Sequence, residues 1–251
     1  ACVPQAATDA ACLNQAISSF GRRAFRRPLT DAEVARFATL ATTIAGKPGS
    51  SLNAGLRSAL NAILQSPSFL YRVELGAPSA ADGGKLKYTD FEMASRLAAT
   101  LWDSVPDDAL LDAAGAGMLA TVDGVKAQAE RLLADPRAKR SLRAFADELF
   151  GLNHLAEAIK DPAIFPSWSD ELKPALKQEL ELKIEDMVFS QKGDFFSLYD
   201  DRVTFLNHDL AKFYGVPDVQ GDGFVRTELP TDSHRLGLRV VAVGAGIDIA
   251  D

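Results

Sequence analysis

The residue types best suited to acid–base chemistry gather between residues 199 and 209. Asp200 and Asp201 precede His208, which is one of three histidines in the chain. An imidazole oriented by a carboxylate can act as a general base that activates water, so Asp200, Asp201 and His208 are candidate catalytic residues of a hydrolase. The alternative is structural: an aspartate that caps a helix and a histidine on a solvated helix face.

A second cluster of oxygen-bearing side chains follows at residues 218–228. Asp218, Gln220 and Asp222 occupy the first, third and fifth positions of a loop with glycine at the sixth, as in calcium-binding loops. The bidentate acid expected at the twelfth position is out of register, because Glu228 lies one place early. One hypothesis is Ca²⁺ held by these four residues in a metal-assisted hydrolase of a small ester or lactone. The other is a plain glycine-containing turn.

The N-terminal region carries a basic cluster. Four arginines form two pairs spaced four residues apart on one expected helix; they are Arg22, Arg23, Arg26 and Arg27. Guanidinium groups at this spacing can bind a phosphate, a carboxylate or an acidic protein partner, which would make the chain a protein-interaction module. The alternative is ion pairing within the protein, with acids such as Asp147 and Glu148.

The elements that position these residues are expected to be helices. Thr30 with Glu33, and Thr89 with Glu92, form capping boxes that mark two helix starts. No long alternating segment precedes residue 224, so the predicted class is all-α, an irregular multi-helix bundle with room for a short extended C-terminal tail. Apolar residues recur at helical spacing over residues 8–27, 30–45, 51–65, 89–102, 122–134, 136–150, 169–191 and 204–214, and shorter helical segments are expected over 68–75 and 107–114.

Composition and charge suggest how these helices divide into domains. A glycine-rich and alanine-rich stretch at 76–86 separates a predicted basic sub-domain (1–76) from a predicted acidic main helical domain (87–217), which an irregular tail follows (218–251). Residues 1–75 hold 8 Lys and Arg against 4 Asp and Glu, whereas the whole chain holds 27 against 34. The simplest interpretation is that the two regions pack on each other.

Whole-chain properties exclude several classes of protein. The 251 residues are 47% hydrophobic and 24% charged, with no stretch near the roughly 18 apolar residues of a membrane span, which excludes an integral membrane protein, collagen and wholesale disorder. A net charge of −7 argues against general affinity for nucleic acid. Both cysteines, Cys2 and Cys12, lie in the first dozen residues, a pattern typical of a disulfide in an exported protein.

Four stretches of the sequence resemble one protein family. They are FGRRAFRRPLTDAE (20–33), LQSPSFLYRVE (64–74), YTDFEMASRLAATLWDSVPDDALL (88–111) and DDRVTFLNHDLAKFYGVP (200–217). The family comprises exported bacterial proteins, frequent in planctomycetes and myxobacteria, that are built from helical domains of unknown function. The resemblance covers roughly residues 10–238. It implies a periplasmic or extracellular location and a role in electron transfer or in handling an extracellular substrate.

The same resemblance bears on cofactors and partners. In that family such domains usually accompany c-type haem segments with a Cys-x-x-Cys-His motif. This chain has no cysteine after Cys12, which excludes covalent haem here. The resemblance implies a helical, non-haem domain with a haem-bearing or acidic protein partner. The last dozen residues differ from the family's continuation, so we expect a truncated tail.

Overall fold

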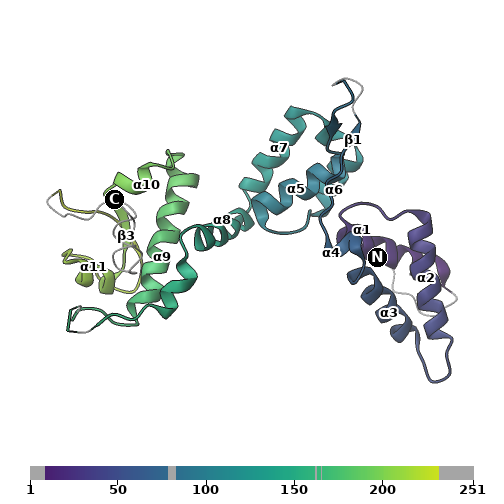
Figure 1. Cartoon of the computed structure of the whole chain (residues 1–251), viewed down its shortest axis with the longest axis horizontal. Helices are drawn as coiled ribbons and strands as arrows, with labels where there is room; N and C mark the ends of the chain where they lie inside the picture. Colours follow the sequence, from purple (N-terminus) through teal and green to yellow (C-terminus); the bar gives the residue numbers. More distant parts are fainter. Residues whose placement is uncertain (1–8, 79–82, 162, 165, 232–251) are drawn as a thin grey trace. The chain divides into compact units, whose positions relative to one another are not determined.

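The structure, a computed structural model, describes residues 9–78, 83–161, 163–164 and 166–231. These residues are predominantly helical, which confirms the predicted class, and the sheets among them are two antiparallel strand pairs. The chain divides into two compact units, Ala1–Ala138 (unit 1) and Lys139–Asp251 (unit 2). The α-helices and two of the strands are labelled in Figure 1. In the described ranges, no helix combines the length and apolar character needed to cross a membrane.

Unit 1 consists of short helices and one small sheet. The strands β1 (Ala77–Pro78) and β2 (Leu86–Lys87) pair with each other between α4 and α5. The boundary between the units falls inside α8. The helices are α1 (Ala10–Phe25), α2 (Asp31–Ala45), α3 (Leu52–Leu64), α4 (Pro67–Leu70), α5 (Asp90–Trp102), α6 (Asp108–Gly115), the 3₁₀ helix η2 (Met118–Ala120), α7 (Val122–Leu133) and α8 (Pro136–Leu149).

Both predicted capping boxes are confirmed. Thr30 and Glu33 exchange hydrogen bonds at the start of α2, and Thr89 and Glu92 do so at the start of α5. Each box satisfies backbone N–H groups that have no partner inside the helix. The sequence therefore fixes where α2 and α5 begin.

The first three helices pack around an apolar cluster centred on Leu13, Ile17, Phe37 and Ile63. The helices α2 and α3 approach each other closely at Gly55, where an added Cβ would lie 2.2 Å from the Ala41 carbonyl oxygen. Only glycine fits at this crossing.

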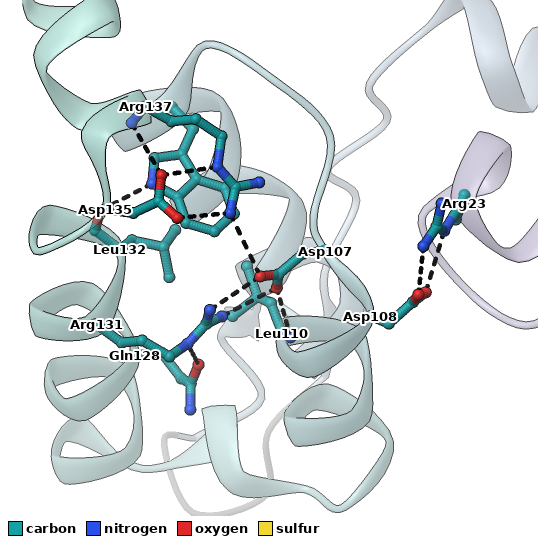
Figure 2. Close-up of polar contacts among 10 residues, drawn as sticks. Arg23, Asp107, Asp108, Leu110, Gln128, Arg131, Leu132, Asp135 and Arg137 are labelled. Carbon is teal, nitrogen blue, oxygen red and sulfur yellow. Dashed lines mark hydrogen bonds and ion pairs between the residues drawn. The ribbon is translucent and has the colours of Figure 1, made fainter.

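Trp102, on α5, contacts residues of both α7 and α8. It is completely buried, its indole N–H donates to the Leu132 carbonyl (2.8 Å), and the Arg137 guanidinium lies 3.4 Å from its ring centroid. Arg137 also pairs with Asp135 (2.8 Å), while Arg131 pairs with Asp107 at 2.9 and 3.0 Å, as Figure 2 shows. The Arg131 pair joins the start of α6 to α7, and Arg137, which lies 3.7 Å from the Asp107 carboxylate, joins it to α8.

Unit 2 is built around α9. A buried carboxylate, Glu179, accepts hydrogen bonds from the hydroxyls of Thr204 and Tyr214 and so connects α9 to β3 and α11. The ammonium group of Lys183 donates to the carbonyls of Asp201 (3.1 Å) and Val203 (2.7 Å). The elements are η3 (Leu152–Glu157), α9 (Leu172–Glu185), the π-helical turn η4 (Asp186–Gln191), α10 (Ser197–Asp200), β3 (Val203–Leu206), α11 (His208–Tyr214) and β4 (Val225–Glu228).

Two helices expected from the sequence have one wrong boundary each. The segment predicted to be helical over 68–75 is helical only as far as Leu70, where α4 ends. The helix predicted over 204–214 begins at His208, because residues 203–206 form β3, which pairs with β4 from Val203↔Glu228 to Leu206↔Val225. Valine, threonine and phenylalanine favour a strand, and Asn207 caps the helix that follows. The strand β4 also lies inside the segment expected to be an irregular tail.

Some predictions concern residues outside the described part of the chain. Cys12 is buried in α1, but Cys2 lies outside the described residues, so the disulfide stays a prediction. The expected truncation of the last dozen residues also falls there. The compact units divide within the predicted 87–217 domain, and the predicted domain boundaries stay predictions.

Candidate functional site

The structure places the predicted catalytic histidine at the first position of α11, exposed to solvent. The backbone N–H of His208 donates to the Gly221 carbonyl (3.0 Å), and its Nδ1 lies 3.2 Å from the Val219 carbonyl oxygen. Both contacts attach the loop after α11 to the start of that helix. The second contact orients the imidazole toward the Val219 carbonyl.

The two predicted catalytic aspartates come before β3 in the chain, whereas His208 comes after it. Asp200 ends α10, and the Oδ1 of Asp201 accepts from the Val203 N–H (2.9 Å). The 4 residues of β3 separate them from α11, a span of about 13 Å at ~3.3 Å per residue. No hydrogen bond between the described residues joins either aspartate to His208.

The four predicted calcium ligands occupy two different elements. Asp218, Gln220 and Asp222 are exposed in the loop after α11, whereas Glu228 ends β4 and pairs with Arg202 (2.9 Å). Within the part of the chain that the structure describes, no three His, Cys, Asp or Glu side chains group closely enough to hold a metal ion. The calcium site stays a prediction.

The predicted internal pairing of the N-terminal arginines is confirmed, but the acids differ from those expected. Arg22 pairs with Asp112 (2.5 Å), and Arg23 pairs with Asp108, as Figure 2 shows for the latter. Asp147, which was expected to pair with them, instead forms an ion pair with Lys177 (2.5 Å) in unit 2.

Arg26 differs from its neighbours because its partners are backbone carbonyls. Its guanidinium donates to the carbonyls of Ala24 and Phe69 (3.3 Å each) and to those of Ser68 and Tyr71 (2.8 Å each). Among the described residues no carboxylate pairs with it. Burial, and next the nearby charge of Arg72, lower the pKa of Arg26. The group therefore carries a positive charge that no acid of its own offsets.

Arg26 lines a cleft of about 530 Å³ in unit 1, between the ends of α1 and α4 and the start of α5. Three arginines line it against one acid, Glu92. The lining residues are Phe25, Arg26, Arg27, Ser68, Tyr71, Arg72, Val73, Thr89, Phe91, Glu92 and Ser95. The volume is in the range of small-molecule sites.

The other two arginines of the cleft already have carboxylate partners. Arg27 forms a two-pronged pair with Glu33 at 2.9 Å for both bonds, which lowers the pKa of Glu33 to about 2. Arg72 lies 3.2 Å from Glu74, whose second oxygen binds Arg96 at 2.7 Å. Because two guanidiniums share Glu74, this pair of arginines keeps a net positive charge.

Two further residues define the floor of the cleft. Ser95 is 5% exposed, and its Oγ has no hydrogen-bond partner among the described residues. A buried hydroxyl without a partner costs about 1–3 kcal/mol, so a ligand that bonds to it gains that energy. Glu92 is fully engaged, since it accepts from the N–H groups of Thr89 (2.7 Å), Leu75 (2.8 Å) and Gly76 (3.0 Å). Burial favours a higher pKa for Glu92, but these bonds outweigh it and lower the pKa.

Sequence reasoning found Arg26 and Arg27 but missed Arg72 and Ser95. Arg72 lies in the stretch 64–74 that carries the family resemblance, yet nothing in its spacing relates it to Arg26. Ser95 lies on α5 among apolar residues that face the core, and a buried serine without a partner has no sequence signature. The periodicity of α5 could indicate only that a polar residue lies on its apolar side, not that its hydroxyl lacks a partner.

The described residues thus form a predominantly helical protein with one arginine-lined cleft suited to an anion. Residues 88–216 match the model of a protein family described as PSD4, protein of unknown function (DUF1592), and residues 12–74 match that of PSD5, protein of unknown function (DUF1595). The first match covers half of the chain, and the chain belongs to the DUF1592 family. No curated protein and no solved structure matches this chain.

Proposed function

We propose that this chain is a ligand-binding domain that takes a carboxylate into the arginine-lined cleft of unit 1. The observation that carries the proposal is the pair of like charges at Arg26 and Arg72, of which Arg26 has no acid partner among the described residues. An anion near the two guanidiniums relieves their repulsion, and it forms charge-assisted hydrogen bonds with Arg72.

The geometry favours a carboxylate over a phosphate. Glu92 lines the same cleft, and Glu33 and Glu74 form ion pairs with two of its arginines. These acids repel a dianion more strongly than a monoanion. The planar guanidinium of Arg72 can donate two parallel hydrogen bonds to a carboxylate, and the Ser95 hydroxyl supplies a further donor.

Arg26 is a positioning residue in this proposal. Four of its five N–H donors are used on backbone carbonyls, so it contributes charge and holds residues 68–71 in place. Direct bonds to the ligand come from Arg72 and Ser95.

The wider setting of the domain is also a proposal. The family resemblance supports an exported protein that works beside a haem-bearing or acidic partner in electron transfer or substrate handling. An acidic partner would supply the carboxylate that the cleft favours. Two free thiols in protein purified from an oxidising compartment would overturn the predicted disulfide between Cys2 and Cys12.

The direct test is an NMR titration with N-acetylglutamate methylamide at constant ionic strength. We expect saturable shifts of the Arg72 and Ser95 amide signals. Arg72→Gln should weaken binding at least about tenfold, and Ser95→Ala should weaken it without lowering thermal stability, because its Oγ makes no hydrogen bond within the described structure.

The matched control is Arg57→Gln, which removes an exposed arginine of α3 outside the cleft. This variant should bind the probe like the parent. The proposal is wrong if the probe causes no saturable shift, or if Arg72→Gln and Arg57→Gln bind it equally.

A further inference from the structure

The segment that follows α4 runs along the cleft with unused backbone groups. No turn or bend interrupts the chain between Tyr71 and Gly76, and Tyr71 is extended (φ −112°, ψ 140°). Within the described residues, the N–H and C=O groups of residues 72–74 have no hydrogen-bond partner. An extended chain with unpaired backbone groups is equivalent to the edge of a sheet.

Both ends of this segment are anchored by side chains from other elements. At one end Arg26 binds the Tyr71 carbonyl (2.8 Å), and at the other Glu92 accepts from the N–H groups of Leu75 (2.8 Å) and Gly76 (3.0 Å). The segment is therefore held in place before any ligand arrives, which reduces the entropy lost on binding.

Side chains along the segment alternate in character. Tyr71, Val73 and Leu75 are 65%, 54% and 73% exposed, although all three are large and apolar. In an extended chain alternate residues share one face, which groups Tyr71 with Val73 and Arg72 with Glu74. Tyr71, Arg72 and Val73 all line the cleft. A strand laid beside the segment would meet apolar groups on one face and, on the other, Arg72 next to Glu74, a carboxylate that Arg72 shares with Arg96.

We propose that the carboxylate reaches the cleft as an acidic side chain of an extended peptide segment in a partner protein, which adds as a strand along residues 72–74. This inference rests on the proposed function and names its ligand class. Strand addition supplies affinity through main-chain hydrogen bonds and specificity through alternate side chains. The alternation predicts a recognised pattern of apolar, acidic and apolar residues, with the acid opposite Arg72.

The experiment compares three probes by isothermal titration calorimetry on the full chain. They are N-acetylglutamate methylamide, the capped peptide acetyl-Thr-Val-Glu-Val-Thr-amide, and the same peptide with its backbone nitrogens methylated. We expect the plain peptide to bind at least about tenfold more tightly than the single amino acid. The methylated peptide should lose that advantage, because methylation removes the N–H donors of a β-ladder.

A variant of the segment gives a second measurement. Val73→Pro removes an N–H that has no partner among the described residues, and proline favours an extended conformation in the residue before it. We expect the peptide to lose its affinity advantage over the single amino acid, measured as the ratio of the two affinities in the same variant. Val73→Ala keeps the N–H and should keep most of that affinity.

The outcomes separate the two proposals. If the amino acid and the peptide bind equally, or if Val73→Pro leaves peptide binding intact, strand addition is wrong and carboxylate binding stands. If neither probe binds, both proposals are wrong. Light scattering that shows a dimer of the free chain, abolished by Val73→Pro, would assign the segment to a second copy and overturn the peptide partner.

Discussion

Arg26 combines an unfavourable backbone conformation with favourable hydrogen bonds of its side chain. It ends α1 in the left-handed region (φ 58°), a conformation that costs a non-glycine residue on the order of 1 kcal/mol. Its four bonds to carbonyls of residues 24 and 68–71 offset that cost. The side chain thus fixes the geometry on which the cleft depends.

Two substitutions separate these contributions. Arg26→Ala should lower the free energy of unfolding by about 2 kcal/mol, since it removes charge-assisted hydrogen bonds and keeps the strain. Arg26→Gly should cost less, because glycine adopts the left-handed conformation freely. Denaturant melts of both variants measure the difference.

The exposed Arg23 is the control for this pair. Its side chain is 63% exposed, and Arg23→Ala should unfold close to the parent. If both Arg26 variants also unfold like the parent, the carbonyl contacts do not stabilise the fold.

The arginine cluster shows what can be predicted at the scale of a residue. Four guanidiniums in one short stretch of a chain with more acids than bases predict ion pairs, and pairs were found. The partners could not be predicted, because Arg22 and Arg23 meet acids that are 85 to 90 positions away in the sequence. The carbonyl partners of Arg26 depend on tertiary structure alone.

At the scale of an element, the capping box of α2 predicts a pH dependence. Hydrogen bonds from Arg27, and next the backbone of Thr30, lower the pKa of Glu33 from 4.5 to about 2. A carboxyl whose pKa is lowered by folding stabilises the native state above its unfolded pKa. That contribution is lost as the pH falls from about 4.5 through about 2.

The measurement is denaturant unfolding at a series of pH values. Glu33→Gln should lose part of the fall in stability between about pH 4.5 and 2, because glutamine does not titrate. Glu130→Gln, which removes an exposed acid 4.0 Å from Lys126, should keep the parent's profile. Identical profiles for the parent and Glu33→Gln would contradict the role given to the Arg27 pair.

Helix starts were easier to predict than strands. Thr30 and Thr89 begin their helices where their capping boxes indicate, because capping is local chemistry. The strand β3 was missed because its 4 residues precede a helical pattern directly and its partner β4 is about 20 residues away. The cleft likewise joins three separate stretches of the chain, whose meeting no local pattern encodes.

At the scale of the whole molecule, the two units differ in charge. Unit 1 holds 14 of the 27 Lys and Arg and 14 of the 34 Asp and Glu, which leaves 13 and 20 in unit 2. The net charge of −7 therefore lies entirely in unit 2. An acidic ligand is repelled by unit 2 and meets a locally positive surface at the cleft of unit 1.

The integrity of unit 2 depends on the buried carboxylate of Glu179. Tyr214→Phe removes the hydroxyl that donates to it at 2.7 Å, leaving a buried carboxyl group with one donor fewer. We expect the free energy of unfolding of unit 2 to fall by about 1–3 kcal/mol. Far-ultraviolet circular dichroism during denaturation measures the change.

The matched control is Tyr199→Phe, because Tyr199 is exposed and its hydroxyl forms no hydrogen bond within the described part of the chain. It should unfold like the parent. Equal stability of the Tyr214→Phe and Tyr199→Phe variants would show that Glu179 does not depend on the Tyr214 hydroxyl.

The burial of Trp102 has an optical consequence. The chain has two tryptophans, and each unit contains one: Trp102 is completely buried in unit 1, and Trp168 is half-buried beside Phe213 in unit 2. In Trp168→Phe the remaining indole emission comes from unit 1 alone, and it shifts to longer wavelength when water reaches the ring. The unfolding of unit 1 can then be followed within the intact chain as a shift of the Trp102 emission maximum.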